Sequence, residues 1–315
     1  MTAMEIAELR FRAMGSDAHL IVVGGNQGMA EAARARIDEL EQRWSRFLPD
    51  SEVNLLNRRA GLATTVSHDT RELVRRAIEA WRLSGGGFDP TLLGAIVRAG
   101  YDRSFEELGP APPAGSSPLG VGADQIVVDG TQVLLPAGTG FDPGGIGKGL
   151  AADMVAAETM ARGAAGVCVN LGGDLRAAGI GPAGSGWTVA LEHAWSADPI
   201  ANVGLADGAV ATSTTLRRHW ETDGQPRHHL IDPQTGQPSD TDLNFCTVIT
   251  GQAWVAEVLA KAVLLRGATH PFDILDGTAA EALVVDRDGR ITNTPGFRSY
   301  LGGQQLPASL LVPVR

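Results

Sequence analysis

The segment from Phe141 to Asp153 reads FDPGGIGKGLAAD and joins a glycine-rich turn to the start of a helix. Its four glycines let the backbone approach a ligand, and Lys148 supplies a cation where the helix begins. Such a loop offers backbone N–H groups and a positive helix end to a phosphate. The segment lacks both the P-loop order G-x-x-x-x-G-K-[ST] and a G-x-G-x-x-G fingerprint after a strand. Its own residues therefore fit a structural turn as well as a phosphate site.

Helical patterns flank this segment on both sides. Apolar residues recur at spacings of three and four, which predicts amphipathic helices. The predicted helices are 28–47, 70–82, one that opens within 142–149, and one from 253 to Gly267. Phe47 is predicted on the inward face of the first helix, and Asp69 or Thr70 is the predicted cap of the second.

Strand patterns are equally frequent. Asp129-Gly130 stands between two apolar runs and predicts a hairpin over 126–135, and 282–292 follows the same pattern. Further strands are predicted at 18–24, 165–171, 187–192, 207–212, 228–231 and 244–250. Because helices and hairpins mix without strict βαβ alternation, the sequence predicts an α+β fold with a mainly antiparallel sheet.

Length and composition limit the organisation and the partners. The 315 residues favour one large domain over 1–315, and the Pro/Gly/Ser-rich stretch 108–122 predicts a flexible loop. A net charge of −10 without a basic face disfavours nucleic-acid binding. No apolar stretch approaches the roughly 20 residues of a membrane span, and the first residues do not resemble a signal peptide. We therefore expect no membrane insertion and a cytoplasmic protein. Cys168 and Cys246 lie in apolar runs and are predicted to be buried thiols.

Two more segments carry candidate chemistry. VNLGGDLRAAG at 169–179 places Asn170 and Asp174 around a glycine pair, which fits a tight hairpin turn or a ligand site. RHHLIDPQTGQP at 227–238 places a His pair before a polar turn. A His in such a place is a candidate acid, base or ligand-orienting group, although most loop histidines have none of these roles.

The order of these segments along the chain resembles the ApbE family of FAD:protein FMN transferases. The resemblance extends from about Phe11 to about Arg266 and rests on six separated motifs. They are FRAMGS at 11–16, WSRFLPDSEVNLLN at 44–57, GGFDPTLLG at 86–94, and the three segments quoted above. The family implies a single ApbE or T-fold-like domain with a mainly antiparallel sheet and packed helices.

The resemblance implies a role for particular residues. Met14 is expected beside the flavin, Asp142 and Lys148 are expected to hold the dinucleotide, and His229 is expected close to the reacting phosphate. The adenosine side of FAD is expected to meet Gly87, Phe88 and Asp89. The predicted FAD-binding residues also include Gly145, Gly172, Gly173, Asp174 and Ser213.

The family reaction splits the FAD pyrophosphate. A Thr or Ser hydroxyl of an acceptor protein attacks the FMN-side phosphorus, and AMP leaves. This displacement requires neutralisation of the phosphate charge, usually by Mg²⁺, and a positioned nucleophile. Lys148 and the backbone N–H groups of 144–149 are candidates for the first task. His229 is the candidate base or hydrogen-bond donor for the second.

The chain departs from the family at the metal ligands. Relatives place an Asp and, four residues later, a Thr on one helix face, where both reach Mg²⁺ with a loop carbonyl that would here be Gly145. Glu257 replaces the Asp and Lys261 replaces the Thr. An ammonium has no lone pair for a metal. Lys261 therefore either stands in the place of the ion as a catalytic cation, or forms an exposed helical pair with Glu257 worth about 0.3–0.5 kcal/mol.

A second departure lies at 211–220, where Ser213 is followed by Thr214 in place of the family's Gly. The added side chain removes backbone freedom next to the ligand. The altered positions leave three functions open: FMN transfer to an acceptor protein, FAD binding without catalysis, and FAD hydrolysis to FMN and AMP.

Overall fold

The computed structural model describes residues 4–103, 120–192, 198–217, 219–222, 225–307 and 309–310. The chain divides into two compact units. Unit 1 comprises Met1–Asp38, Lys148–Thr214 and Thr241–Arg315, and unit 2 comprises Glu39–Gly147 and Thr215–Asp240. The single domain stays a prediction, and most of the predicted flexible loop, residues 108–119, lies outside the described residues.

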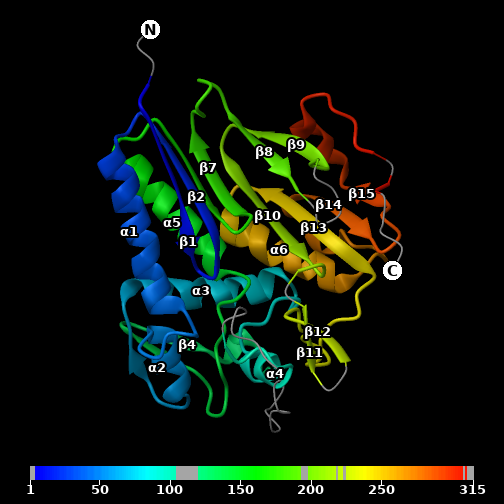
Figure 1. The fold of residues 1–315 in the computed structure, drawn as a ribbon. Helices are drawn as coiled ribbons and strands as arrows, with labels where there is room; N and C mark the ends of the chain where they lie inside the picture. Colours follow the sequence, from blue (N-terminus) through cyan, green and yellow to red (C-terminus); the bar gives the residue numbers. More distant parts are fainter. Residues whose placement is uncertain are drawn as a thin grey trace. The chain divides into compact units, whose positions relative to one another are not determined.

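An eight-stranded sheet forms the centre of unit 1 (Figure 1). Its strands, in spatial order, are β1 (Ile6–Ala13), β2 (Ser16–Val23), β6 (Gly166–Leu171), β7 (Asp174–Gly179), β10 (Gly208–Thr214), β13 (Leu243–Thr250), β14 (Glu281–Asp286) and β15 (Ile291–Asn293). Every neighbouring pair in this sheet is antiparallel. The predicted α+β class with a mainly antiparallel sheet is confirmed.

The sheet is covered on both faces. Helix α6 (Ala253–Arg266) packs on β10 and β13. The other face packs against the hairpin of β8 (Trp187–Leu191) and β9 (Ala201–Leu205) and against the 3₁₀ segment Pro295–Leu301. Because both faces are covered, seven of the eight residues of β13, LNFCTVIT, are buried, instead of every second one.

Helix α5 (Gly147–Ala161) is attached to the beginning of α6 at two points. A Cβ on Gly149 would lie 2.4 Å from the carbonyl oxygen of Ala253, so only glycine permits this close approach. One turn later, the Asp153 carboxylate accepts the N–H groups of Ala253 at 2.9 Å and Trp254 at 3.0 Å. Asp153 thus caps α6 from a neighbouring helix, because Gln252 provides no side-chain cap.

Unit 2 combines short helices with small sheets (Figure 1). Its helices are the last turns of α1 (Gln27–Trp44), α2 (Glu52–Arg58), α3 (His68–Leu83), α4 (Leu93–Arg98) and the 3₁₀ turn Ala123–Gln125. Its strands are β3 (Thr64–Thr65), β4 (Val127–Asp129) and β5 (Gln132–Leu134), ordered β3-β5-β4, and the hairpin of β11 (His219–Thr222) and β12 (Gln225–His228).

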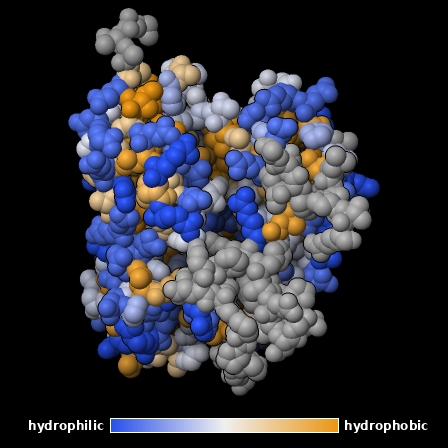
Figure 2. All heavy atoms as spheres, in the orientation of Figure 1, coloured by the Kyte–Doolittle hydropathy of each residue, from blue (hydrophilic) through white to orange (hydrophobic). Residues whose placement is uncertain are grey.

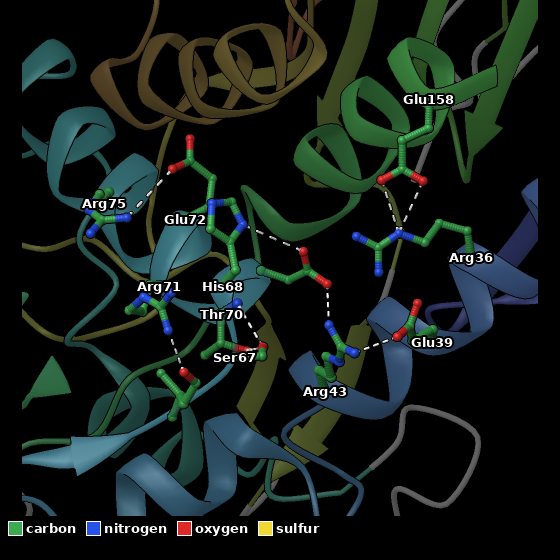
Figure 3. Close-up of polar contacts among 12 residues, drawn as sticks. Arg36, Glu39, Arg43, Ser67, His68, Thr70, Arg71, Glu72, Arg75 and Glu158 are labelled. Atoms are coloured by element: carbon green, nitrogen blue, oxygen red, sulfur yellow. Dashed lines mark hydrogen bonds and ion pairs between the residues drawn. The ribbon is translucent and has the colours of Figure 1, made fainter. Parts of the chain in front are cut away.

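The cap of α3 differs from the prediction. Ser67, rather than Asp69 or Thr70, accepts the N–H of Thr70, and the Glu52 carboxylate fixes Ser67 by accepting its N–H at 2.9 Å and its hydroxyl at 2.6 Å. Asp69 is instead an ion-pair partner of Arg43, which also pairs with Glu39 (Figure 3). The cap was mispredicted because Ser67 is held in place by Glu52, a residue of another helix whose contact with Ser67 is not visible in the local sequence.

Two other predictions need correction. Helix α1 ends at Trp44, so Phe47 lies beyond the helix and is 37% exposed instead of facing inward. The predicted strand 228–231 is absent from the described residues, where β12 ends at His228 and Ile231 makes a single bridge to Pro238. Strands β1, β3, β7, β9 and β11 and helices α2 and α4 were not predicted.

The prediction that both cysteines are buried thiols agrees with the structure. Both cysteines are buried and unpaired as thiols, and burial raises the pKa of the Cys168 thiol to about 12. Among the described residues, no helix is long and apolar enough to cross a bilayer. The face drawn in Figure 2 is largely hydrophilic, with apolar residues in small separate groups.

Candidate functional site

Lys148 lies between two buried carboxylates of unit 1. Its ammonium forms an ion pair with Asp174, whose side chain is 4% exposed, and lies 3.9 Å from Oε1 of Glu257, whose side chain is 6% exposed. The Lys148 side chain is 23% exposed, so part of it is accessible to solvent. The predicted residues Lys148, Asp174 and Glu257 therefore form one charged cluster that is open to solvent at Lys148.

Glu257 is buried and forms a hydrogen bond with the beginning of α5. Its Oε2 accepts the N–H of Gly149, the third residue of α5, at 2.8 Å. A carboxylate at this position satisfies an otherwise unpaired N–H and meets the positive end of the helix dipole. Because Glu257 is buried, the prediction of an exposed Glu257–Lys261 pair is wrong. Lys261 lies one turn further along α6 and is partly buried.

The glycine-pair turn joins the same cluster. Gly172 and Gly173 have φ values of +68° and +98°, which only glycine adopts readily, and they lead directly into Asp174. A Cβ on Gly172 would lie 2.7 Å from Cβ of Ser16 and 4.0 Å from Nζ of Lys148. The β1–β2 turn, the glycine-pair turn and Lys148 therefore meet at one end of the sheet.

Met14 lies in that β1–β2 turn, between the register partners Ala13 and Ser16. It has φ +50° and is followed by Gly15 at φ +65°, the consecutive positive values of a tight hairpin turn. Positive φ is unfavourable for a Met side chain. Met14 therefore holds a backbone conformation that lowers the stability of the fold, and its place beside the flavin stays a prediction.

We expect Met14→Asn to stabilise the protein by about 0.5–1 kcal/mol, because Asn tolerates positive φ, and to weaken FAD binding. Thermal unfolding and FAD titration measure the two effects. Met4→Asn, at an exposed residue outside the strands, is the matched control and should change neither. A Met14→Asn variant that is less stable than the wild type would contradict the interpretation that the backbone of Met14 is strained.

Ser213 lies at the same end of the sheet as the glycine-pair turn. The pairing of β10 with β7 ends at Val210 and Leu175, and β10 continues beyond it to Thr214. The Thr214 hydroxyl donates to the carbonyl of Asn244 at 2.7 Å. The residue that replaces the family's Gly is thus used in the contact of β10 with β13.

Most N–H groups of the glycine-rich loop are already used within the chain. Gly144 donates to Oδ1 of Asp142 at 3.0 Å, and Ile146 and Gly147 donate to the carbonyl of Pro143 at 3.1 and 2.9 Å. Gly149 donates to Glu257. These four groups are therefore not available to the predicted backbone cradle over 144–149.

Asp142 is fixed within unit 2. Its N–H donates to the carbonyl of Pro90 at 2.8 Å, and its Oδ1 lies 3.5 Å from Nε of Arg46. Gly145, in the same unit, has φ +114°. Sequence reasoning quoted the motif that contains Arg46 but assigned the residue no role, because the contact joins positions about a hundred residues apart.

The contacts of the F-D-P triplet in unit 2 are with its own fold. Phe88 is 2% exposed and therefore a core residue, and it follows Gly87 directly. Asp89 accepts the N–H and hydroxyl of Thr91 at 2.8 and 2.6 Å. The side chains of Phe88 and Asp89 thus shape the loop, and a role in binding adenosine stays a prediction.

His229 precedes a turn that agrees with the sequence prediction. Asp232 accepts the N–H of Gln234 at 2.8 Å and the hydroxyl of Thr235 at 3.2 Å. The neighbouring His228 ring bonds to the carbonyl of Ser239 at 2.8 Å. His229 is thus a partly buried side chain on a loop that is fixed on both sides.

Comparison with known proteins gives a consistent result. Residues 14–284 match the ApbE family. The FAD:protein FMN transferase of Treponema pallidum is 30% identical over 277 residues, which cover 79% of this chain and 74% of that protein. The FAD:protein FMN transferase of Klebsiella pneumoniae is 25% identical over 93% of this chain and 89% of its own length.

Solved structures show the same fold. The ApbE protein of Thermotoga maritima superposes with a TM-score of 0.84 at 25% identity, covering 94% of this chain and 99% of that one. The flavinyl transferase ApbE of Pseudomonas stutzeri superposes with a TM-score of 0.80 at 26% identity, covering 96% and 98%. The chain belongs to the ApbE family.

Proposed function

We propose that this protein transfers FMN from FAD to a Thr or Ser hydroxyl of an acceptor protein. The hydroxyl oxygen forms a bond to the FMN-side phosphorus, the bond from that phosphorus to the bridging oxygen breaks, and AMP leaves with the bonding electron pair. The family membership and the named relatives support the reaction. The observation in this chain that supports it best is the Lys148 cluster, which is open to solvent at Lys148.

The proposed roles follow from the residue chemistry. Lys148 neutralises charge that develops on the pyrophosphate, held in place by Asp174 and Glu257 before the substrate arrives. His229 takes the proton of the attacking hydroxyl or donates a hydrogen bond to the phosphate. Among the remaining predicted residues, Met14, Asp142 and Ser213 are proposed to bind FAD. The protein's cytoplasmic location stays a prediction from the sequence.

The residues at the family's metal positions do not suit Mg²⁺. Lys261 has no lone pair to give. The Oε2 of Glu257 accepts the N–H of Gly149, and its Oε1 lies 3.9 Å from the Lys148 ammonium. No step of the proposed reaction is therefore assigned to Mg²⁺, and Lys261 is proposed as the second cation of the site.

Transfer should accordingly proceed without added metal. The test mixes purified protein, FAD and a candidate acceptor, with Mg²⁺ or with a chelator, and examines the denatured acceptor for covalent flavin fluorescence. The variant that carries Glu257→Asp and Lys261→Thr restores the family pair, and its transfer should become dependent on Mg²⁺. Strict Mg²⁺ dependence of the wild type would contradict the role of Lys261.

The same experiment separates the alternative functions by their products. Free FMN and AMP would indicate an FAD pyrophosphatase, for which water is the nucleophile. Bound but unchanged FAD would indicate a binding protein, which the altered metal positions favour. Absence of FAD binding would contradict all three functions.

A further inference from the structure

Arg46 lies in the turn that follows α1, in the motif WSRFLPDSEVNLLN. The side-chain amide of Asn54 donates to the carbonyl groups of Arg46 and Leu48, both at 2.8 Å. These two bonds fix the backbone of the turn from a neighbouring helix. The direction in which the Arg46 side chain leaves the turn is therefore set by the fold.

The Arg46 guanidinium is packed against two aromatic rings. Its carbon lies 4.1 Å from the centre of the Phe47 ring and 4.5 Å from that of the Tyr101 ring. The side chain is only 7% exposed. Ring faces attract a cation and stack on its plane, so the two rings hold the guanidinium in one orientation.

This packing brings the cation to Asp142. The Nε of Arg46 lies 3.5 Å from Oδ1 of Asp142, whose side chain is 10% exposed. The influence of Arg46 extends to a second carboxylate, since the Arg103 guanidinium and, less strongly, Arg46 hold the pKa of Asp102 below its usual range. Arg46 is thus a buried positive charge directed at a residue that the family assigns to dinucleotide binding.

The arrangement is not the one that stability alone would favour. The Nη2 of Arg46 is buried and has no hydrogen-bond partner among the described residues. A buried donor without a partner is costly, and a buried ion pair is often no more stable than apolar side chains of similar size. Stability alone therefore does not explain why an arginine occupies position 46, and we expect its role to lie in ligand binding.

We propose that Arg46 is a positioning residue for FAD, which acts by holding the Asp142 carboxylate in a fixed direction. The inference rests on the proposed function, in which Asp142 binds the dinucleotide. The contacts of Asp142 with Gly144 and Pro90 fix its backbone and one side-chain oxygen. Arg46 supplies the charge that compensates for burying this carboxylate.

The test compares Arg46→Met with Arg43→Met, its matched control three residues earlier. Arg43 pairs with Glu39 (Figure 3) and with Asp69, and its ion pairs in the described part of the chain do not include Asp142. We expect Arg46→Met to lower the melting temperature, because Asp142 loses its buried partner, and to raise the Kd and KM for FAD on the order of 10-fold to 100-fold, with a smaller change in kcat. Arg43→Met should lower the melting temperature and leave the Kd for FAD unchanged.

A double-mutant cycle tests whether Arg46 acts through Asp142. Arg46→Met combined with Asp142→Asn should bind FAD no more weakly than Asp142→Asn alone, because coupled residues are not additive. Arg46→Lys, which keeps the charge between the rings, should recover part of the affinity. Additive losses, or an unchanged Kd for FAD in Arg46→Met, would overturn the proposal.

The FAD titration also keeps this inference separate from the proposed function. If the wild type binds FAD without transferring FMN, the transfer function fails while the comparison of Kd values still decides the role of Arg46. If Arg46→Met does not fold, the comparison of Arg46→Lys with Arg46→Gln takes its place. Equal Kd values for these two variants would overturn the proposal.

Discussion

Lys148→Met is expected to lower FMN transfer roughly 10²- to 10³-fold and to destabilise the protein. The loss of rate follows because Lys148 is the solvent-accessible cation of the cluster, and removing one preorganised charge-stabilising group has an effect of about this size. The loss of stability, about 2–3 kcal/mol, follows because Asp174 and Glu257 would keep their buried negative charges without the ammonium between them. Transfer kinetics and urea unfolding measure the two effects.

A second substitution separates these two consequences. Adding Asp174→Asn to Lys148→Met removes one of the unbalanced carboxylates and should recover most of the stability. The same double variant should stay as slow as the single one, because no cation returns to the pyrophosphate. Recovery of the rate along with the stability would show that Lys148 acts only on the fold.

His229→Ala is expected to reduce kcat roughly 10²- to 10⁴-fold, the usual contribution of a positioned acid or base. Stability should change little, because the loop is held by the bonds of Asp232 to Gln234 and Thr235, and not by His229 alone. Single-turnover measurement of flavin transfer, with a thermal melt of each protein, checks both statements.

His228→Ala provides the matched control for this prediction. The His228 ring bonds to the carbonyl of Ser239 and accepts the N–H of Leu230 at 3.2 Å, so its removal should loosen the loop and lower the melting temperature. An intact kcat in His229→Ala would show that the assignment of His229 as base or donor is wrong.

Local patterns in the sequence predicted much of the sheet. Asp129-Gly130 marks the turn between β4 and β5, and apolar runs mark β2, β6 and β13. Strand β1 alternates charged and apolar residues, which is the pattern of a half-exposed strand, and this signal was overlooked at the edge of the sheet. Helix α2 has only seven residues, too few for a periodic pattern to be visible.

The identities of the site residues were easier to predict than their partners. Spacing of four along one helix placed Glu257 and Lys261 on one face, but it did not indicate that Glu257 also bonds to Gly149 and faces Lys148. That choice depends on how closely α5 approaches α6, which is a tertiary contact. The motif that contains Arg46 was equally visible, but its contact with Asp142 depends on the folded chain.

The attachment of α5 to α6 fixes the backbone of Lys148 during folding, before any substrate binds. Gly149 and Asp153 hold the first turns of α5 against the beginning of α6, and Lys148 lies in the first turn of α5. The backbone of Lys148 is thus immobilised by the same contacts that build the helical layer. The entropic cost of ordering this cation falls on folding, so substrate binding retains more of the free energy of the new contact.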